Sequence, residues 1–290
     1  MKALIIYNSY SGVNKNKELD YIKNKLIVKY ETIDIYESQN DIKEYVLCYS
    51  SSYNLLIIIG GDGTINQAVN GLMMIKEKPM LAYIPMGTCN DFGRSLNLKK
   101  TLDVITNKII EGKTKRISIN KINTDYYLYG LAIGNMTNVS YQINSKLKRM
   151  FGRLAYYLNA IKHIFKNDSF DLEMKIDDIN IKEKCYCLML LNTKYLASIK
   201  MRFKADYVDN DKIKVILIKK KNRIINLVNL GLFFLFGEKY NHNIKYYEGY
   251  NIKIQTDKLM RYNIDGECLP LLKSVEVNRI KEAINLIVYK

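Results

Sequence analysis

The stretch LLIIIGGDGTINQAVNGL, residues 55–72, constrains the fold of this chain most strongly. An apolar run of strand length ends in three glycines and one aspartate, Asp62, and a helical pattern follows. Similar apolar runs occupy 3–8, 32–37 and 80–85, with polar helical segments between them. Strands that alternate with helices predict a parallel sheet covered on both faces, with ligands bound beyond the carboxyl ends of its strands.

The pattern changes in the second part of the chain. Most of 115–274 reads as short alternating strands, interrupted by two expected helices at 144–166 and 222–236. We therefore expect an α/β domain over 1–114, followed by a second, mainly antiparallel β domain over 115–274. The closing segment, about 275–290, is expected to return to the first domain.

Composition narrows the class of partner. With 45 basic and 29 acidic residues the chain carries a formal net charge of +16, which favours nucleotides, nucleic acid or acidic membrane surfaces. No nucleic-acid-binding motif is recognisable, so nucleic acid is not an expected partner. The apolar run at 224–236 is shorter than the roughly 20 residues that a bilayer-spanning helix needs. Five cysteines without metal-ligand spacing favour reduced thiols and a cytoplasmic location.

The three glycines around Asp62 would let a ligand approach the backbone closely. Thr64 is expected to open the helix, whose first N–H groups attract anions. A carboxylate inside an anion site is explained if a divalent cation lies between them, so Asp62 is expected to hold Mg²⁺ against phosphate oxygens. A structural explanation is also open, because Thr64 and Gln67 fit a capping box.

Two further turns are expected at the same edge of the sheet. IPMGTCNDFGRSL, residues 84–96, leaves the next strand and carries Gly87, Thr88 and Asn90. NSYSG, residues 8–12, follows the first strand. Three polar, glycine-bearing turns at one edge predict a floor for a polyphosphate.

These motifs together carry a family resemblance. GGDGTINQAVNGL followed by PMGTCNDFGRSL closely resembles the diacylglycerol kinase catalytic-domain family, which includes bacterial soluble lipid kinases and sphingosine kinases. NSYSG resembles the N-terminal element of that family, FGRLAYYLNAI (151–161) its central helix, and NIDGECL (263–269) its C-terminal motif. The GGDG element alone also occurs in NAD kinases and phosphofructokinases. The fold of the family, an α/β nucleotide domain followed by a β-sandwich, agrees with the strand pattern.

The resemblance implies roles for individual residues. Asp62 would be associated with the catalytic Mg²⁺, and Asp265 and Glu267 would supply the acid–base group, with Glu267 favoured as the base. A surface β-turn is the structural alternative for the Asp-Gly pair. The residues expected to contact ATP are Asn8, Ser9, Tyr10, Ser11, Gly12, Gly60, Gly61, Asp62, Gly63, Thr64, Ile65, Asn66 and Thr88.

The loop FKADYVDNDKIKV, residues 203–215, departs from the family pattern. Family members commonly carry an Asp-Asp-Gly-like turn here, with an aspartate that serves a structural Mg²⁺ site. This loop keeps Asp209 and Asp211 but lacks the glycine. Both are candidate metal ligands, Asp209 is the better match, and the survival of the site is left open.

Residues 144–166 combine several Lys and Arg residues, no acidic residue, and apolar residues at helical spacing. This pattern is typical of a basic amphipathic helix that docks on an anionic membrane surface, although ordinary core packing is the alternative. We therefore expect a cytoplasmic protein that associates transiently with the inner face of the membrane. A homodimer formed through exposed sheet edges is also open.

The leading functional hypothesis is an ATP- and Mg²⁺-dependent lipid kinase that phosphorylates a lipid hydroxyl, most simply that of diacylglycerol, to give phosphatidate. An NAD kinase-like enzyme shares Asp62 and its glycines and is the first alternative. The second is a non-catalytic nucleotide- or lipid-binding regulator on the same scaffold, suggested by the altered loop at 203–215. The sequence does not identify the lipid.

Overall fold

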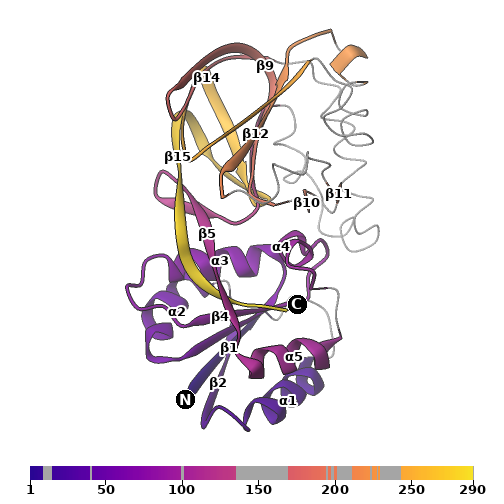
Figure 1. Ribbon diagram of the computed structural model, residues 1–290, viewed down its shortest axis with the longest axis vertical. Helices are drawn as coiled ribbons and strands as arrows, with labels where there is room; N and C mark the ends of the chain where they lie inside the picture. Colours follow the sequence, from indigo (N-terminus) through magenta and orange to yellow (C-terminus); the bar gives the residue numbers. More distant parts are fainter. Residues whose placement is uncertain are drawn as a thin grey trace. The chain divides into compact units, whose positions relative to one another are not determined.

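The computed structural model divides the chain into two compact units, which we describe separately. Unit 1 comprises Met1–Ile119 and Ile280–Lys290, and unit 2 comprises Asn120–Arg279 (Figure 1). The expected helix at 144–166 lies outside the residues that the structure describes. The described residues are 1–8, 15–39, 41–98, 101–134, 169–193, 195–196, 199–200, 211–222, 224–226, 228 and 243–289.

Unit 1 is built on a parallel sheet with the strand order β2-β1-β3-β4-β15. The four strands expected from the apolar runs are all present, and they pair in parallel as expected. The end of β15 joins this sheet where Leu286 pairs with Leu81. Every residue of β3 is buried, because helices cover both faces of the sheet. The strands are β1 (Lys2–Asn8), β2 (Thr32–Ser38), β3 (Leu55–Gly60), β4 (Met80–Pro85) and β15 (Glu267–Ile287).

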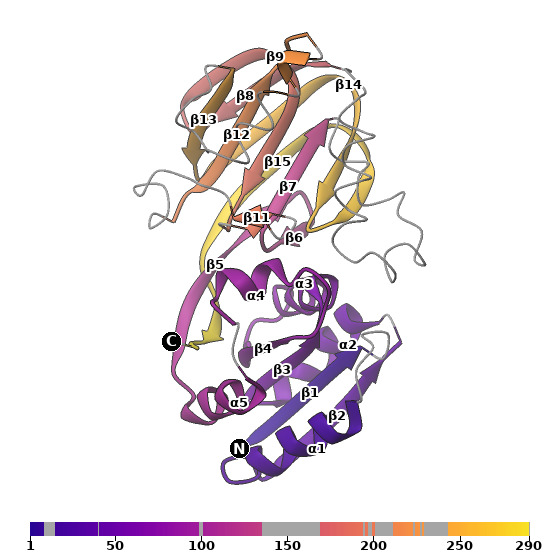
Figure 2. The same ribbon diagram turned by 90° about the vertical axis from the view of Figure 1, so that its right-hand side faces the viewer.

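The helices of unit 1 pack in two pairs. Helix α1 packs against α5 and α2 against α3, and the views in Figures 1 and 2 place the pairs on opposite sides of the sheet. Gly71 allows the close approach of α2 and α3, since a Cβ there would lie 2.6 Å from the carbonyl oxygen of Lys43. The helices are α1 (Lys15–Leu26), α2 (Ile42–Tyr49), α3 (Asp62–Leu72), α4 (Asp91–Ser95) and α5 (Leu102–Glu111), and a 3-10 turn follows α2 at Ser50–Ser52.

Unit 2 is antiparallel, as expected, and its strands close into a ring. Strands β9 and β14 each pair with β8 through their first half and with β7 through their second half. Strands β12 and β13 extend the sheet from β9, and β15 extends it from β14. The expected sandwich is therefore one sheet folded over on itself. The remaining strands of the chain are β5 (Thr114–Ile122), β6 (Asp125–Tyr127), β7 (Gly130–Gly134), β8 (Phe170–Ile176), β9 (Ile179–Leu191), β10 (Tyr195–Leu196), β11 (Ile199–Lys200), β12 (Ile213–Lys219), β13 (Ile244–Gly249) and β14 (Asn251–Ile264).

A shift in register marks the point where β9 changes partners. Ile218 pairs with Cys187 and Lys219 with Cys185, so Tyr186 is the extra residue of a β-bulge. The bulge sends the two cysteine side chains into different apolar clusters. Both thiols are buried, and burial raises the pKa of Cys187 to about 12, which keeps this thiol protonated and unreactive.

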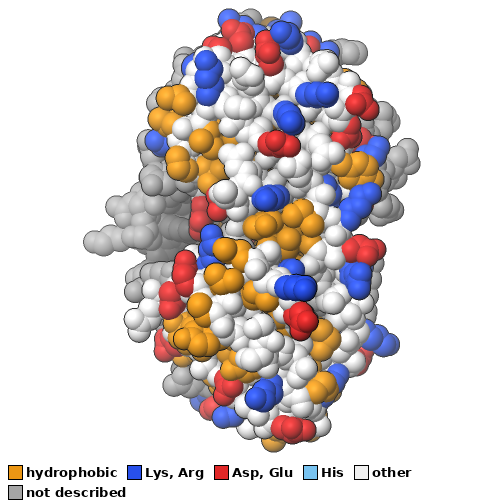
Figure 3. All heavy atoms as spheres, turned by 90° about the vertical axis from the view of Figure 1, so that its left-hand side faces the viewer, with side chains coloured by type: hydrophobic (Ala, Val, Ile, Leu, Met, Phe, Trp, Pro, Cys, Tyr) orange, Lys and Arg blue, Asp and Glu red, His pale blue; other side chains and the backbone are white. Residues whose placement is uncertain are grey.

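The face of the molecule drawn in Figure 3 carries charged side chains of both signs. On the face drawn in Figure 3, Lys and Arg side chains alternate with Asp and Glu and do not gather into one basic patch. Among the described residues, no helix combines the length and the apolar character needed to cross a bilayer.

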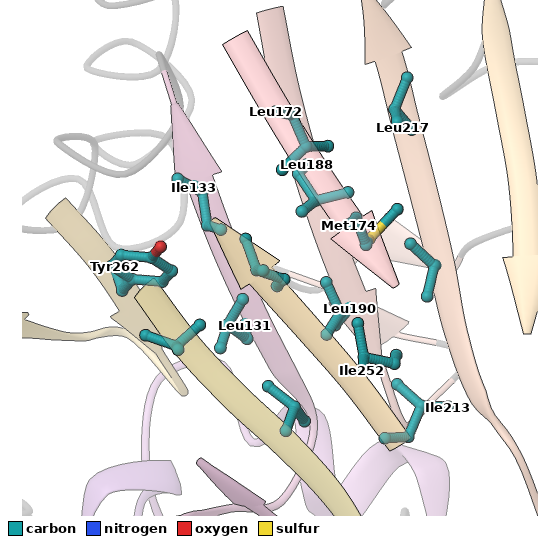
Figure 4. Packing of buried hydrophobic residues seen from close by; sticks show 14 of the residues in the cluster. Leu131, Ile133, Leu172, Met174, Leu188, Leu190, Ile213, Leu217, Ile252 and Tyr262 are labelled. Carbon is teal, nitrogen blue, oxygen red and sulfur yellow. The ribbon is translucent and has the colours of Figure 1, made fainter. Parts of the chain in front are cut away.

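The core of unit 2 fills the inside of the folded sheet. Strand β8 shows strict alternation, with every second residue from Phe170 to Ile176 buried and the residues between them exposed. Its inward side chains meet those of β7, β9, β12 and β14 in one cluster, which Figure 4 shows from close by. Each fully buried Leu or Ile contributes about 1.5–3 kcal/mol. This cluster provides a rigid base for the turn that follows β14.

Candidate active site

The first two glycine-bearing turns meet at the carboxyl edge of the parallel sheet. Strands β3 and β4 end side by side, with Gly60 paired to Pro85, and the N–H of Met86 donates to the carbonyl of Gly60 at 2.8 Å. A Cβ on Gly87 would lie 2.5 Å from the Cα of Gly61. Only glycine fits this contact, so the two turns form one continuous backbone surface.

Helix α3 begins earlier than the sequence predicts. Its first residue is Asp62, and Gly61 is the N-cap. The carbonyl of Gly61 accepts the N–H of Ile65 at 3.2 Å, which starts the helical hydrogen bonding there. The capping box of Thr64 and Gln67, left open as the structural alternative, therefore does not form. Thr64 is buried and packs on Gly60, where a Cβ would lie 2.6 Å from its hydroxyl oxygen.

The Asp62 carboxylate reaches across to the second turn. Its Oδ1 accepts the backbone N–H of Phe92 at 3.2 Å, so Asp62 caps the short helix α4. Burial is the largest influence on this group and raises the pKa of Asp62. Backbone N–H groups of residues 90–92 and the nearby Arg94 only partly offset that effect. The folded protein thus keeps a carboxylate whose negative charge is incompletely compensated.

The second turn is held by its own side chains. Asn90 adopts a left-handed conformation with φ of 52°, and its side chain both accepts from the N–H of Gly87 and donates to the carbonyl of Gly87, each at 2.8 Å. The guanidinium of Arg94 donates to the carbonyl of Cys89 at 2.8 Å. Thr88, at the tip, is exposed.

Two aromatic residues that the sequence interpretation missed support both turns. The hydroxyl of Tyr83 donates to the carbonyl of Gly60 at 3.1 Å, and its ring packs against Phe92 with ring centroids 5.9 Å apart. Tyr83 is fully buried on β4. The apolar run of β4 could have placed the Tyr83 side chain inside, but its hydrogen bond depends on the close pairing of β3 with β4.

The other predicted residues of unit 1 fall into three groups. Asn8 ends β1 and pairs with Ser38 on β2. Ile65 and Asn66 are buried in α3, and Gly63 lies in its first turn. Ser9, Tyr10, Ser11 and Gly12 lie outside the described residues.

In unit 2, Asp265 and Gly266 form the two-residue turn of the β14–β15 hairpin. Both have positive φ, 49° and 91°, and Ile264 pairs with Glu267 across them, the arrangement of a type I′ turn. The structural alternative noted for this Asp-Gly pair is therefore correct as a description of the backbone.

The Asp265 carboxylate is buried and fully engaged with backbone. It accepts the N–H groups of Leu128 at 2.5 Å, Tyr129 at 2.9 Å and Gly130 at 2.9 Å. The hydroxyl of Tyr129 donates to the carbonyl of Asp265 at 2.5 Å. These donors take up most of the acceptor capacity of a carboxylate, which leaves Asp265 little scope to take up a proton.

Glu267 stands in a different environment two residues later. It is exposed, and desolvation by the protein atoms around it raises the pKa of its carboxyl group. A raised pKa brings a glutamate closer to the range in which it exchanges protons near neutral pH.

Of the two candidate ligands of the structural metal site, Asp211 is bound by an arginine side chain. The Asp211 carboxylate accepts from Nε and Nη2 of Arg279 at 3.2 and 2.8 Å. Asp209 lies outside the described residues. Within the described residues, no three His, Cys, Asp or Glu side chains gather closely enough to hold a metal ion. The metal roles of Asp209 and Asp211 stay predictions.

Comparisons with known proteins agree on one family. The model of the diacylglycerol kinase catalytic domain matches residues 2–122. The chain is 31% identical over 275 residues to a diacylglycerol kinase of Staphylococcus epidermidis, covering 92% of this chain and 85% of that protein. It is 32% identical over 274 residues to a diacylglycerol kinase of Staphylococcus aureus, covering 92% of this chain and 86% of that protein.

Solved structures show the same fold. A crystal structure of a diacylglycerol kinase from Bacillus anthracis superposes with a TM-score of 0.81 at 24% identity, covering 99% of this chain and 96% of that one. An NAD kinase from Archaeoglobus fulgidus, solved with ATP, superposes with a TM-score of 0.57 at 12% identity, covering 99% and 93%. The sequence identities and coverage of the staphylococcal proteins decide the assignment: this chain belongs to the diacylglycerol kinase family and is a lipid kinase.

Proposed function

We propose that the chain transfers the γ-phosphate of ATP, with Mg²⁺, to a lipid hydroxyl, most simply that of diacylglycerol. The observation that carries the proposal is the close contact of the Gly61 and Gly87 turns beside the half-buried carboxylate of Asp62, whose negative charge is only partly compensated. Such a surface accepts a polyphosphate through backbone N–H groups and still needs a cation beside Asp62.

Unit 1 would bind the nucleotide. The turns after β3 and β4 expose backbone without side chains at the edge where parallel sheets bind ligands. The first N–H groups of α3 and its positive dipole end favour the negative charge of phosphate. Thr88 lies exposed beside them and offers a hydroxyl hydrogen bond.

The residues present fit Mg²⁺ bound together with a nucleotide. Mg²⁺ at phosphoryl-transfer sites usually takes one or two carboxylates, with substrate phosphates and waters as the remaining ligands. Asp62 would supply that carboxylate, and the cation would offset the desolvation that now raises its pKa. When bound, Mg²⁺ would neutralise charge that develops on the phosphate oxygens.

Unit 2 would supply the base, and we assign this role to Glu267. Glu267 would accept the proton of the lipid hydroxyl as its oxygen forms a bond to the γ-phosphorus and the bond to ADP breaks. Asp265, with three N–H groups on its carboxylate, would hold the hairpin and not titrate in the reaction.

The membrane part of the proposal rests on the sequence. The basic segment 144–166, expected to dock on an anionic bilayer, lies outside the described residues. Cytoplasmic location, transient association with the inner face of the membrane and a homodimer belong to the same proposal. No nucleic-acid partner is proposed.

The test is transfer of labelled γ-phosphate from ATP to a panel of lipids in mixed micelles, with and without Mg²⁺. Wild type is compared with Glu267→Gln and with Glu276→Gln, a matched control because Glu276 is an exposed glutamate on the same strand. We expect Mg²⁺-dependent labelling of phosphatidate. General-base loss should lower the rate of Glu267→Gln about 10²–10⁴-fold, with Glu276→Gln unchanged.

Other results would contradict the proposal in distinct ways. Labelling of NAD with no lipid labelled would favour the NAD kinase-like alternative. ATP binding with no transfer to any acceptor would favour the regulator. Full activity of Glu267→Gln would remove Glu267 from the mechanism while leaving the kinase assignment in place.

A further inference from the structure

We propose that Arg279 and Asn192 are positioning residues, which fix the backbone of residues 128–130 and through it the hairpin turn that presents Glu267. The inference rests on the proposed function, since Glu267 is the base assigned there. The contacts that carry it lie within unit 2 and stand independently of that assignment.

Arg279 is a buried cation with a fixed orientation. Its side chain is only 8% exposed. Its Nε and Nη2 both donate to Oδ1 of Asp211, and its Nη1 donates to the side-chain oxygens of Asn120 and Asn192. The planar guanidinium fork can satisfy three partners at once, and Asp211 supplies the opposite charge that a buried cation needs.

Asn192 connects this cation to the backbone beside the hairpin. Its side-chain nitrogen donates to the carbonyl of Leu128 at 2.8 Å, and its backbone N–H donates to the carbonyl of Tyr129 at 3.0 Å. Its side-chain oxygen is the atom that accepts from Arg279. Asn192 therefore uses both ends of its amide, one toward the cation and one toward the segment.

The same segment is held from the other side by Asp265. Carbonyl groups of residues 128–129 bind Asn192, whereas the N–H groups of residues 128–130 bind the Asp265 carboxylate. Asp265 opens the turn, and Glu267 follows two residues later. A continuous path of hydrogen bonds thus runs from Arg279 through Asn192 and residues 128–130 to the turn.

The path matters because a base works only at the correct distance. A misplacement of about 1 Å can cost on the order of 100-fold in rate. Residues 128–130 are anchored on two sides by charged or amide groups, so removing one anchor should let the segment and the turn shift together. A residue that merely stabilised unit 2 would lower the melting temperature without a selective loss of turnover.

Two asparagines in contact with Arg279 provide a matched pair of variants. Asn192→Asp keeps the oxygen that accepts from Arg279 but removes the donor to the carbonyl of Leu128. Asn120→Asp makes the same chemical change beside the same guanidinium. The buried side chain of Asn120 interacts with the hydroxyl of Tyr127, so the hydrogen bond from Asn192 to the carbonyl of Leu128 is kept in this variant.

The experiment measures three quantities on the chain and its variants. Hydrogen exchange of the amides of residues 128–130 reports whether the segment is held, and steady-state kinetics reports kcat and the KM for ATP. For Asn192→Asp we expect about tenfold faster exchange and about tenfold lower kcat, with the KM for ATP unchanged. Asn120→Asp should match wild type in all three.

A second variant guards against a folding defect in the first. Arg279→Lys keeps the charge, but a lysine cannot bond Asp211, Asn120 and Asn192 together. We expect it to change exchange and kcat in the same direction as Asn192→Asp, with thermal unfolding confirming that both variants fold.

The inference would be overturned if the amides of residues 128–130 exchanged as slowly in Asn192→Asp as in wild type. Fast exchange with unchanged kcat would overturn the positioning role, as would equal effects in Asn120→Asp. If wild type transfers phosphate to no lipid, the proposed function fails, and the exchange measurement alone decides whether Arg279 and Asn192 fix the segment.

Discussion

The chain contains two Asp-Gly pairs, and the structure uses them in opposite ways. Asp62 and Gly63 start a helix, and the Asp62 carboxylate is desolvated with a raised pKa. Asp265 and Gly266 form a hairpin turn, and the Asp265 carboxylate accepts three backbone N–H groups. Desolvation makes the charged form of the first carboxylate unfavourable, whereas three hydrogen bonds stabilise the second carboxylate. The same dipeptide therefore stands in two different environments, in agreement with a functional role proposed for Asp62 and a structural role for Asp265.

The difference follows from what surrounds each carboxylate. A buried charge is tolerated when hydrogen bonds or an opposite charge compensate for lost water, and Asp265 has that compensation within the protein. Asp62 has that compensation only in part, which is why we propose that a bound cation supplies the rest. Groups left in this state are typical of functional sites.

The largest expected effect on stability is at Asp265. Asparagine tolerates the left-handed backbone, but its amide cannot accept three N–H groups as a carboxylate does. Asp265→Asn should therefore lower the free energy of unfolding by about 3–5 kcal/mol, because buried donors lose a charged acceptor. Urea denaturation measures this, and a loss below about 1 kcal/mol would contradict the structural role of Asp265.

The contact between the two glycine turns should be the next most sensitive feature. Alanine at position 87 would place its Cβ 2.5 Å from the Cα of Gly61, which is a severe clash. Alanine at position 61 would place its Cβ 3.3 Å from the Cα of Gly87, which is a milder contact. Gly87→Ala should cost about 1–3 kcal/mol and raise the KM for ATP, and Gly61→Ala should cost less. Thermal unfolding and ATP titration of both variants measure these losses. A larger loss in Gly61→Ala than in Gly87→Ala would contradict the prediction.

A smaller effect is expected at Tyr129, whose hydroxyl donates to the carbonyl of Asp265 at 2.5 Å. Tyr129→Phe keeps the ring and its backbone N–H bond to Asp265 and removes one hydrogen bond. The free energy of unfolding should fall by about 1 kcal/mol. Tyr247→Phe, which removes the hydroxyl of a half-buried tyrosine on β13 of the same unit, provides a control in the same urea titration. Equal losses in the two variants would mean that the hydrogen bond from Tyr129 to the turn makes no particular contribution to the free energy of unfolding.

The smallest expected effect has the opposite sign and concerns Asp62. Burial raises the pKa of its carboxyl group, so the folded protein binds a proton there more tightly than the unfolded chain. The stability associated with that proton is present below the unfolded pKa and is lost as pH rises through the folded pKa. The free energy of unfolding of Asp62→Asn at pH 7 should thus be slightly above that of wild type, and the difference should shrink toward zero as the pH falls below the ordinary pKa of an aspartate. Denaturant titrations across that range would detect the trend, and a gain that grows at low pH would contradict it.

Much of the fold follows from sequence pattern, and the site follows only in part. Four apolar runs identified the parallel strands of unit 1, since buried parallel strands are nearly continuous in apolar residues. The position of the glycine turns at one sheet edge followed from the same pattern. The start of α3 did not, because Thr64 offers a local capping signal that the extended backbone of Gly61 overrides.

The contacts that distinguish the two aspartates join residues far apart in the chain. Asp62 caps a helix 30 positions later, and Asp265 binds backbone more than 130 positions earlier. No local propensity encodes such partners, because they exist only after the sheet has formed. For the same reason the guanidinium of Arg279 beside Asp211, where the sequence suggested a metal, could not be foreseen.

The most direct test of the account is to measure stability and activity of Asp62→Asn in the same preparation. Asparagine keeps the size of the side chain and an oxygen that can accept from Phe92, but removes the charge that a cation needs. We predict at least about 10³-fold lower phosphoryl transfer, together with a free energy of unfolding at pH 7 equal to or above that of wild type. A variant that loses stability while retaining transfer would contradict the account, since Asp62 would then be structural in the way that Asp265 is.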